Sequence, residues 1–225
     1  MNKHTYSSGK AQSWRDKAEF SARMKIYKAL ASNIPLNDCN PIIDVGVTAD
    51  IQKDSSNFFE KIYPYPERIT ALSDQDASWM ADKWKGLKFV QGNALNMPFE
   101  DDFFDLSFSN AVIEHVGNKD NQIAFIRECI RVSRKYVFIT TPNRYYPIEL
   151  HTALPLIHWL PPKVFRYILM KLNKSFFASE NNLNLLSKND LTEMMKKIPD
   201  VSYTIGAIRF IGFKSNILLT ITKRP

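Results

Sequence analysis

Short apolar runs and amphipathic segments alternate over residues 1–143 of the chain. Apolar runs bounded by turn residues are typical of buried strands, whereas apolar residues at three- and four-residue steps are typical of helices. The first expected strand begins at Ile42. The other four cover Arg68–Ser73, Lys88–Val90, Phe104–Ser109 and Lys135–Thr140. The expected helices are Trp14–Ser32, Ser55–Ile62, Ala77–Lys85 and Gln122–Val132. This alternation predicts an α/β fold with a mostly parallel, doubly wound sheet.

Two of these helices have further sequence signals. The first carries Phe20, Met24 and Tyr27 on one stripe, so we expect it to pack at the edge of the sheet. The second begins with Ser55 and Ser56, and either hydroxyl is suited to cap it.

The alternation stops after Asn143. Residues 144–186 contain two apolar and aromatic pieces, His151–Trp159 and Pro162–Leu172, which are expected to be short helices. We interpret this segment as a helical insertion that forms a lid over a substrate site.

The C-terminal part is expected to complete the sheet. A capping signal at residues 187–190 predicts a helix over Leu191–Lys197. The runs Ser202–Phe210 and Asn216–Thr222 alternate apolar and polar residues, which predicts an antiparallel closing hairpin. The expected organisation is an N-terminal helical segment (1–40), an α/β core (41–143), the insertion (144–186) and a C-terminal helix with closing strands (187–225), all within one domain.

Polar residues gather where the expected strands end, especially within residues 89–116. They are Asn93, Asp105, Ser109, Asn110, Glu114 and His115. Ligands of open α/β sheets bind beyond the carboxyl ends of the strands, so these positions predict a site. Gly46 follows the first strand, where a glycine lets a ligand approach the backbone and turn amides can face it. Asp74 follows the next strand, the position at which such sheets hold a ribose diol.

Composition and charge narrow the class of protein. Residues 1–143 hold 18 basic and 18 acidic residues, whereas residues 144–225 hold 12 basic and 5 acidic, so the net charge of +7 lies in the second part. A basic region suits nucleic acid, an anionic membrane surface or an acidic substrate, or is simply a solvated face. Cys39 and Cys129 lack metal-ligand spacing, so we expect reduced thiols and no metal site. The N-terminus has no apolar signal region, and we expect a cytoplasmic protein, with peripheral membrane contact as an option.

The ordered motifs resemble class I S-adenosylmethionine-dependent methyltransferases of the type 11 kind, which act on small molecules and glycans. Residues 42–50 stand where that family has its cofactor loop. Residues 92–94 and 97–99 are similar to its D-A…L-P-F segment. Residues 104–106, Ser109 and Glu114–Val116 are similar to its F-D-x-V…EH-V segment, which is the most specific match.

The resemblance implies a Rossmann-like fold, S-adenosylmethionine as the cofactor, and transfer of its methyl group to a hydroxyl or amine of a small-molecule, glycan or lipid-linked acceptor. The cofactor-binding residues it implies are Asp44, Gly46, Thr48, Asp74, Asn93, Ala94 and Ser109. His115 is the candidate general base, because histidine titrates nearest to physiological pH. Its alternative is a structural role at the start of a helix. Asp105 is interpreted as bonding a backbone turn near the cofactor.

The family's glycine-rich loop reads D-x-G-x-G-x-G, and this chain departs from it. Only Gly46 is kept, and Thr48 and Asp50 stand at the other two glycine positions. Asn93 replaces the acid on the adenine side. A threonine hydroxyl and an asparagine amide can both hydrogen-bond a ligand.

The candidate substrate residues follow the fifth strand. Asn143 is either a turn former or a substrate amide, and Tyr145, His151 and His158 give the insertion an aromatic and basic surface. Such a surface suits a sugar ring, a phosphate or a lipid-linked acceptor.

Three alternatives remain open. A nucleic-acid methyltransferase is suggested by the charge, but Ser109–Val112 is not the [DN]-P-P-[FY] clamp that holds base amino groups. A non-catalytic cofactor-binding or scaffolding protein is suggested by the shortened glycine loop. A nicotinamide dehydrogenase lacks support because the chain has no G-x-G-x-x-G fingerprint.

Overall fold

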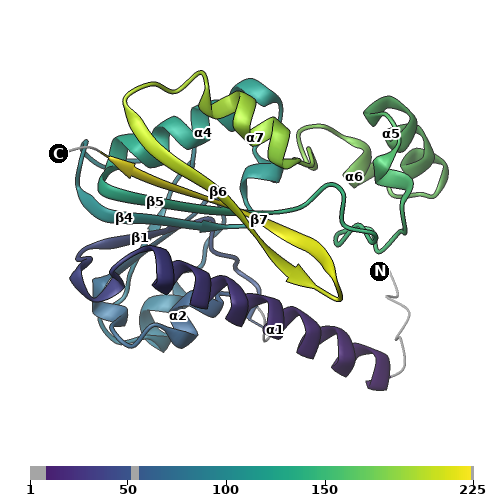
Figure 1. The fold of residues 1–225 in the computed structure, drawn as a ribbon. Coiled ribbons are helices and arrows are strands. Elements are labelled where there is room, and N and C mark those ends of the chain that lie inside the picture. The colour runs from purple at the N-terminus through teal and green to yellow at the C-terminus, as the bar shows by residue number, and fades with distance from the viewer. Residues whose placement is uncertain (1–8, 52–55, 224–225) are drawn as a thin grey trace.

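A computed structural model describes residues 9–51 and 56–223 and contains one seven-stranded sheet (Figure 1). The strand order is β3-β2-β1-β4-β5-β7-β6. The strands are β1 (Ile42–Val45), β2 (Ile69–Ser73), β3 (Lys88–Gln91), β4 (Phe104–Asn110), β5 (Ser133–Pro142), β6 (Val201–Phe210) and β7 (Phe213–Lys223). The first five are parallel, β7 is antiparallel to β5, and β6 is antiparallel to β7. The predicted doubly wound sheet with a closing hairpin is confirmed.

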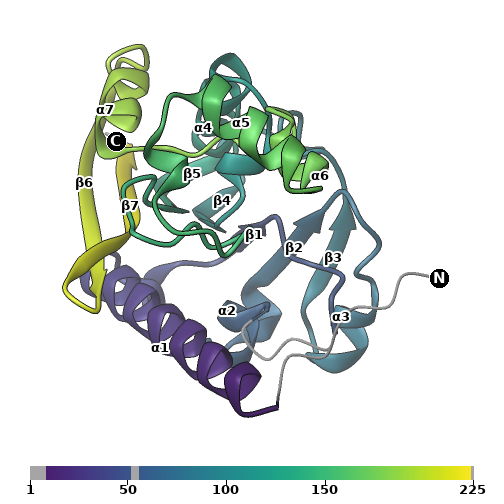
Figure 2. The ribbon, with the colours of Figure 1, turned by 90° about the vertical axis from the view of Figure 1, so that its right-hand side faces the viewer.

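Helices cover both faces of the sheet (Figures 1 and 2). One face carries α1 (Gly9–Asn33), α2 (Phe58–Ile62) and α3 (Trp79–Lys83), and the other carries α4 (Lys119–Val132) and α7 (Lys188–Met195). Each side has its own apolar core, with Phe59 stacked on Phe108 at 4.7 Å on the first. Phe125 and Cys129 of α4 are fully buried on the second. Two buried layers on one sheet leave its carboxyl edge as the place where a ligand can enter.

The first helix differs from the prediction in where it lies. α1 crosses a face of the sheet, where Ile26 and Leu30 are fully buried. It reaches the edge only at its contact with β6, where Lys25 Nζ donates to the Arg209 carbonyl (2.9 Å). The expectation of edge packing is therefore correct only for that contact.

Local hydrogen bonds explain where several helices begin. The predicted signal before α7 is a capping box, in which Ser187 and Asp190 bond each other's backbone amides. Asn118 caps α4 by accepting from the Asn121 amide. The predicted helix before Tyr63 is present as α2, but it begins after Asn57, whose φ is 48°, and not at Ser56. Ser55, the other expected cap, lies outside the described residues.

The expected helix over residues 151–159 is also wrong. Only Ile157–Trp159 forms a helical turn (η4), and Ala153 and Leu156 adopt positive φ. The Glu149 carboxylate accepts from the backbone amides of His151 and Thr152, which turns the chain there instead of letting it coil. The second expected helix is confirmed as α5 (Pro162–Lys171), and a short helix, α6 (Ser175–Ala178), follows it.

The closing strand β7 does not alternate as predicted. It lies between β5 and β6, and residues 215–219 are buried without interruption. A strand inside a sheet with both faces covered needs apolar residues on both sides. Ser215 and Asn216 are the polar members of this buried run.

Asp105 is structural, as expected, but it lies away from the site. It stands near the amino end of β4 and accepts from the Asn40 amide (3.0 Å) and the Arg134 guanidinium. Burial opposes its ionisation, but these bonds and Lys135 outweigh burial and lower the pKa of Asp105. The expectation that Asp105 bonds a turn near the cofactor is corrected, because ligands of such sheets bind at the opposite edge.

The insertion has a small core of its own and is fastened beside the carboxyl edge (Figure 2). Phe165, Leu169 and Leu183 are buried within it. Asn184 donates from its backbone amide to the Glu114 carbonyl (2.7 Å) and from its side chain to the Gly117 carbonyl (2.9 Å). Among the described residues, no helix combines the length and the apolar character that a membrane span requires.

Candidate functional site

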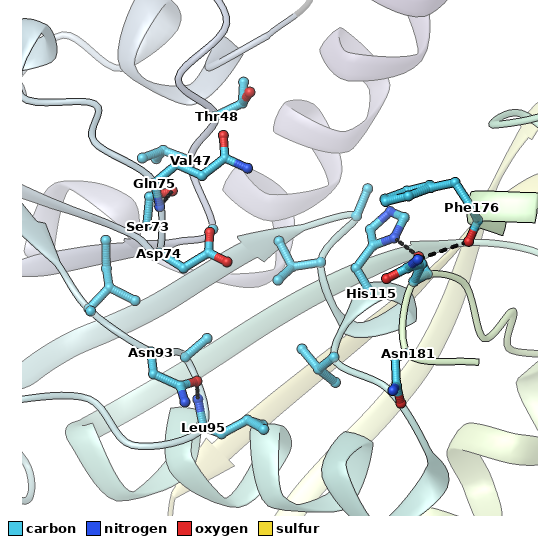
Figure 3. Close-up of a pocket in the computed structure, with 18 residues that line it drawn as sticks. Val47, Thr48, Ser73, Asp74, Gln75, Asn93, Leu95, His115, Phe176 and Asn181 are labelled. Atoms are coloured by element: carbon cyan, nitrogen blue, oxygen red, sulfur yellow. Dashed lines mark hydrogen bonds between the residues drawn. The ribbon is translucent and has the colours of Figure 1, made fainter. Parts of the chain in front are cut away.

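A cavity of about 590 Å³ opens at the carboxyl ends of the parallel strands (Figure 3). Its walls come from residues 46–48 after β1, 72–75 at the end of β2, 92–95 after β3, residues between 111 and 116 after β4, and Phe176, Asn181 and Asn182 of the insertion. Its volume lies within the usual range for cofactor and small-molecule sites. The cavity lies at the strand ends where the sequence predicts a site.

The turn after β1 approaches the segment after β4 so closely that only glycine fits. Gly46 has φ +90°, and a Cβ added there would lie 2.3 Å from Val112 Cγ2. Positive φ disfavours any other residue as well. Gly46 therefore forms a narrow wall shared by the large cavity and a smaller adjoining one.

The amides of this turn do not face the cavity as predicted. Gly46 and Val47 donate to the Leu72 carbonyl (2.8 and 3.1 Å), and Thr48 donates to Asn57 Oδ1 (3.0 Å). Asn57 Nδ2 donates back to the Thr48 carbonyl (2.8 Å), which clamps the turn. The one-glycine loop is thus closed by protein acceptors, and it offers a ligand a close surface and the Thr48 hydroxyl.

Asp74 and Asn93 point into the cavity from one side (Figure 3). The Asp74 side chain is exposed, and no hydrogen bond to its carboxylate is found in the described part of the chain. Asn93 Oδ1 accepts from the Leu95 amide (2.9 Å), which leaves its NH2 group for a ligand. Ala94 also lines the cavity, and Gln75 is a neighbour of Asp74 that sequence reasoning missed.

A smaller hollow of about 230 Å³ adjoins the large cavity and shares its β1 turn. Asp44, Asn110 and His151 line it, together with Arg23 of α1. Asp44 is buried beside Glu60, and burial raises the pKa of both groups. The Glu60 carboxyl raises the pKa of Asp44 further, whereas the hydrogen bond with Asp44 opposes the rise at Glu60. Asp44 thus lies beside the smaller hollow and not in the large cavity.

Arg23 also lines the smaller hollow. Sequence reasoning missed it, because its position depends on where α1 crosses the sheet.

Ser109 does not line the cavity, which corrects its assignment to the cofactor. It is fully buried, and its hydroxyl donates to the Val45 carbonyl (2.8 Å). That bond ties β4 to the end of β1, so the role of Ser109 is to hold the two strands that carry the site.

Three of the four candidate substrate residues lie away from both hollows. Asn143 is a turn former: its NH2 donates to the Lys214 carbonyl (2.9 Å) and its Oδ1 accepts from the Tyr145 amide (3.2 Å). The Tyr145 side chain is exposed. His158 is buried, its Nε2 lies 2.7 Å from the Tyr146 carbonyl, and burial lowers its pKa. These placements correct the substrate assignments of Asn143, Tyr145 and His158.

The fourth candidate, His151, meets His115. Their Nε2 atoms lie 3.1 Å apart, and each is 4.0 Å from Oε1 of the fully buried Glu114. His115 Nδ1 lies 2.6 Å from the Asn182 carbonyl, and His151 Nδ1 lies 2.7 Å from Glu149 Oε1. His115 faces the large cavity opposite Asp74, so the cluster stands where the two hollows meet (Figure 3).

Glu149 is ionised at neutral pH. Burial opposes ionisation, but the His151 ring and the backbone amides of His151 and Thr152 outweigh it and lower the pKa of Glu149 to about 2. An ionised carboxylate can only accept a hydrogen bond, so His151 Nδ1 carries a hydrogen.

Known proteins resemble this chain in part of its sequence and in its fold. A family model described as a methyltransferase domain, of the type 11 group, matches residues 56–139. The match covers β2 to β5 and begins after the β1 turn, where two family glycines are missing.

Solved structures share the whole fold at low sequence identity. An S-adenosylmethionine-dependent methyltransferase from Thermotoga maritima is 14% identical with a TM-score of 0.57, over 96% of this chain and 95% of that one. Magnesium protoporphyrin IX methyltransferase from Synechocystis PCC 6803, solved with S-adenosylhomocysteine, is 10% identical with a TM-score of 0.58, over 99% and 90%. The N-methyltransferase NodS from Bradyrhizobium japonicum is 10% identical with a TM-score of 0.55, over 93% and 98%.

The chain has the fold of class I S-adenosylmethionine-dependent methyltransferases, and residues 56–139 match the methyltransferase-domain model. S-adenosylmethionine is the cofactor that this match indicates. The residues present fit that group, because Asp74 offers a carboxylate in the cavity and Gly46 removes the side chain that would narrow it. The relatives act on different acceptors, so the fold alone does not define the acceptor.

Gly46→Ala is expected to lower the free energy of unfolding by about 2 kcal/mol and to abolish binding of S-adenosylhomocysteine, because the new Cβ meets Val112 at a positive φ. Val112→Ala removes the two nearest atoms, at 2.3 and 2.9 Å, but not the φ strain. The double variant should therefore lose less unfolding free energy than the sum of the losses in the two single variants. Urea unfolding and calorimetric titration measure both effects, and wild-type affinity in Gly46→Ala would contradict the assignment.

Proposed function

We propose that the enzyme methylates a hydroxyl or amine of an amphiphilic, lipid-linked or glycan-type acceptor, and that the acceptor loses its proton at the cluster of Glu114, His115 and His151. The observation that carries this proposal is the position of His115. It faces the cavity opposite Asp74, and the Asn182 carbonyl holds its Nδ1 hydrogen, so its neutral ring keeps the Nε2 lone pair.

Different residues are suited to bind different parts of the cofactor. When bound, S-adenosylmethionine supplies a methyl group that is already electrophilic on its sulfonium. Asp74 is suited to accept from ribose hydroxyls, and Asn93 to donate to the adenine ring. Arg23 faces the smaller hollow, where its guanidinium is suited to the carboxylate of the cofactor's amino-acid end.

The chain's own part in the chemistry is alignment and proton transfer. The cluster aligns the acceptor beside the cofactor site and takes up its proton. The buried Glu114 carboxylate and the Glu149–His151 pair lie next to His115 and stabilise a positive charge formed there. Thr141 Oγ1 donates to Glu114 Oε2 (2.9 Å) and keeps that carboxylate in place.

The character of the acceptor follows from the outer face of the insertion. Val164, Tyr167 and Met170 of α5 are 44%, 62% and 59% exposed. Their three-residue steps form one apolar stripe on the helix. The segment 161–176 carries Lys163, Arg166, Lys171 and Lys174 and no acidic residue.

An apolar stripe flanked by cations is suited to the surface of an anionic bilayer. Phe176 of α6, which follows α5, is 64% exposed and also lines the cavity. A bilayer bound at α5 would therefore present a lipid-linked acceptor next to the site.

Replacement of His115 by alanine tests the proton acceptor. We expect methyl incorporation from labelled cofactor into lipid and small-molecule extracts to fall about 100-fold or more, which is typical of a lost general base. Binding of S-adenosylhomocysteine should change little, since Asp74 and Asn93 are untouched, and this titration also controls for folding. Undiminished methyl transfer by His115→Ala would refute the assignment.

Flotation with vesicles tests the membrane surface. Wild-type protein should float with vesicles of phosphatidylglycerol and phosphatidylcholine at low salt, but not with phosphatidylcholine alone. Tyr167→Glu with Met170→Glu should abolish flotation, because both charges enter the apolar stripe. Ile211→Glu is the matched control, since Ile211 is 76% exposed at the distant β6–β7 turn. Absence of wild-type flotation, or equal flotation of the double variant, would reject membrane binding.

A further inference from the structure

Three lone pairs converge in the cluster of Glu114, His115 and His151. The Asn182 carbonyl and the Glu149 carboxylate can only accept, so Nδ1 of both rings carries a hydrogen. In the neutral rings both Nε2 atoms are then acceptors, and they face each other at 3.1 Å. Glu114 Oε1 is buried and has no hydrogen-bond partner among the described residues. Three acceptors at these distances repel one another unless a proton or a cation lies among them.

The spacing of these atoms is close to that of metal ligands. The three ligand atoms all lie within 4.8 Å of one another. Tetrahedral zinc with bonds of about 2.0–2.1 Å places its ligand atoms about 3.3 Å apart, close to the distance between the two Nε2 atoms. Glu114 Oε1, at 4.0 Å from each nitrogen, has to approach by less than about 1 Å.

The groups behind the ligands have the arrangement that metal sites use. A histidine ligand donates its other ring hydrogen to a carbonyl or a carboxylate, which fixes its tautomer and its orientation. Asn182 and Glu149 accept those hydrogens here, and Thr141 holds the second oxygen of Glu114. All three ligands are thus oriented before any ion binds.

We propose that Glu114, His115 and His151 bind one divalent transition-metal ion of the zinc type. Two imidazoles and one carboxylate favour such an ion over magnesium or calcium, which prefer oxygen ligands. Three protein ligands leave a coordination position open, as in catalytic zinc sites. This site was not expected from the sequence, because His151 comes from the insertion and the other two ligands follow β4.

Charged groups of both signs surround the cluster. Glu149 bonds His151, and Asp44 and Arg23 line the smaller hollow together with His151. Burial lowers the pKa of Arg23, whereas the carboxylates of Glu19, Glu114 and Asp44 raise it, Glu19 most. Arg23 thus reduces the negative potential at the cluster without giving Glu114 Oε1 a hydrogen bond.

The proposed ion adds a step to the proposed function, because its open coordination position would take the acceptor oxygen. Only this role of the ion in methyl transfer rests on the proposed function. With Nε2 of His115 bound to the ion, the ring is not itself the base; the ion lowers the pKa of that hydroxyl instead, and its proton leaves to water. One C–S bond of the cofactor breaks as one O–C bond forms. The binding of the ion itself does not depend on methyl transfer.

Calorimetric titration of the full chain with Zn2+, after treatment with a chelator, tests the site. We expect one equivalent to bind to the wild-type protein. Glu114→Gln and His151→Gln should each weaken binding at least tenfold, and Glu149→Gln about tenfold through the orientation of His151. Glu193→Gln is the control, because Glu193 is an exposed carboxylate of α7 that bonds Lys196.

Two further measurements keep the outcomes distinct. Each variant is titrated with S-adenosylhomocysteine; loss of Zn2+ with cofactor affinity retained supports the metal site and leaves the methyltransferase assignment intact. The visible spectrum of wild-type protein with Co2+ needs no variant and should show the intense bands of a low-symmetry site. Absence of Zn2+ uptake and of these bands, or equal Zn2+ affinity in all variants, would overturn the proposal and leave a proton shared between the two histidines.

Discussion

The close contact between Gly46 and Val112 is the constraint on which the site depends. It brings the turn after β1 against the segment after β4, with no room for one more carbon atom. The large cavity lies on one side of this contact and the smaller hollow on the other. The same segment continues into Glu114 and His115, so the position of the histidine cluster relative to the cofactor site follows from this single approach.

The missing glycines are compensated by side chains. In place of a loop whose amides face the ligand, the reciprocal bonds between Asn57 and Thr48 close the turn. Arg23 adds a cation beside this turn, although it lies in α1, which precedes β1 in the chain. A loop with one glycine can therefore keep its shape, because the fold supplies elsewhere the hydrogen bonds and the charge that the glycine-rich form takes from its backbone.

The sequence predicted what depends on local pattern. The strands, the position of Gly46 and the ends of β2 and β3 at Asp74 and Asn93 follow from apolar runs and turn residues near in sequence. The sequence did not predict the direction in which a side chain points or the contacts between residues far apart in the chain. The Ser109 hydroxyl faces β1 rather than the cavity, and Asn143 serves a turn, because both are set by neighbouring strands. The meeting of His115 with His151, 36 residues apart, depends on how the chain returns to the sheet after α4, β5 and the start of the insertion.

The central claim is that the cavity at the carboxyl edge binds S-adenosylmethionine through Asp74. Calorimetric titration with S-adenosylhomocysteine tests it most directly, on wild-type protein, Asp74→Ala and Asp76→Ala. Asp76 is the matched control, since it lies two residues further on and bonds the Ser78 amide instead of lining the cavity. We predict binding by wild-type protein and Asp76→Ala, and a loss of about 10- to 100-fold in Asp74→Ala, as for a hydrogen bond to a charged group. Equal affinity in all three proteins, or no binding by the wild type, would contradict the account.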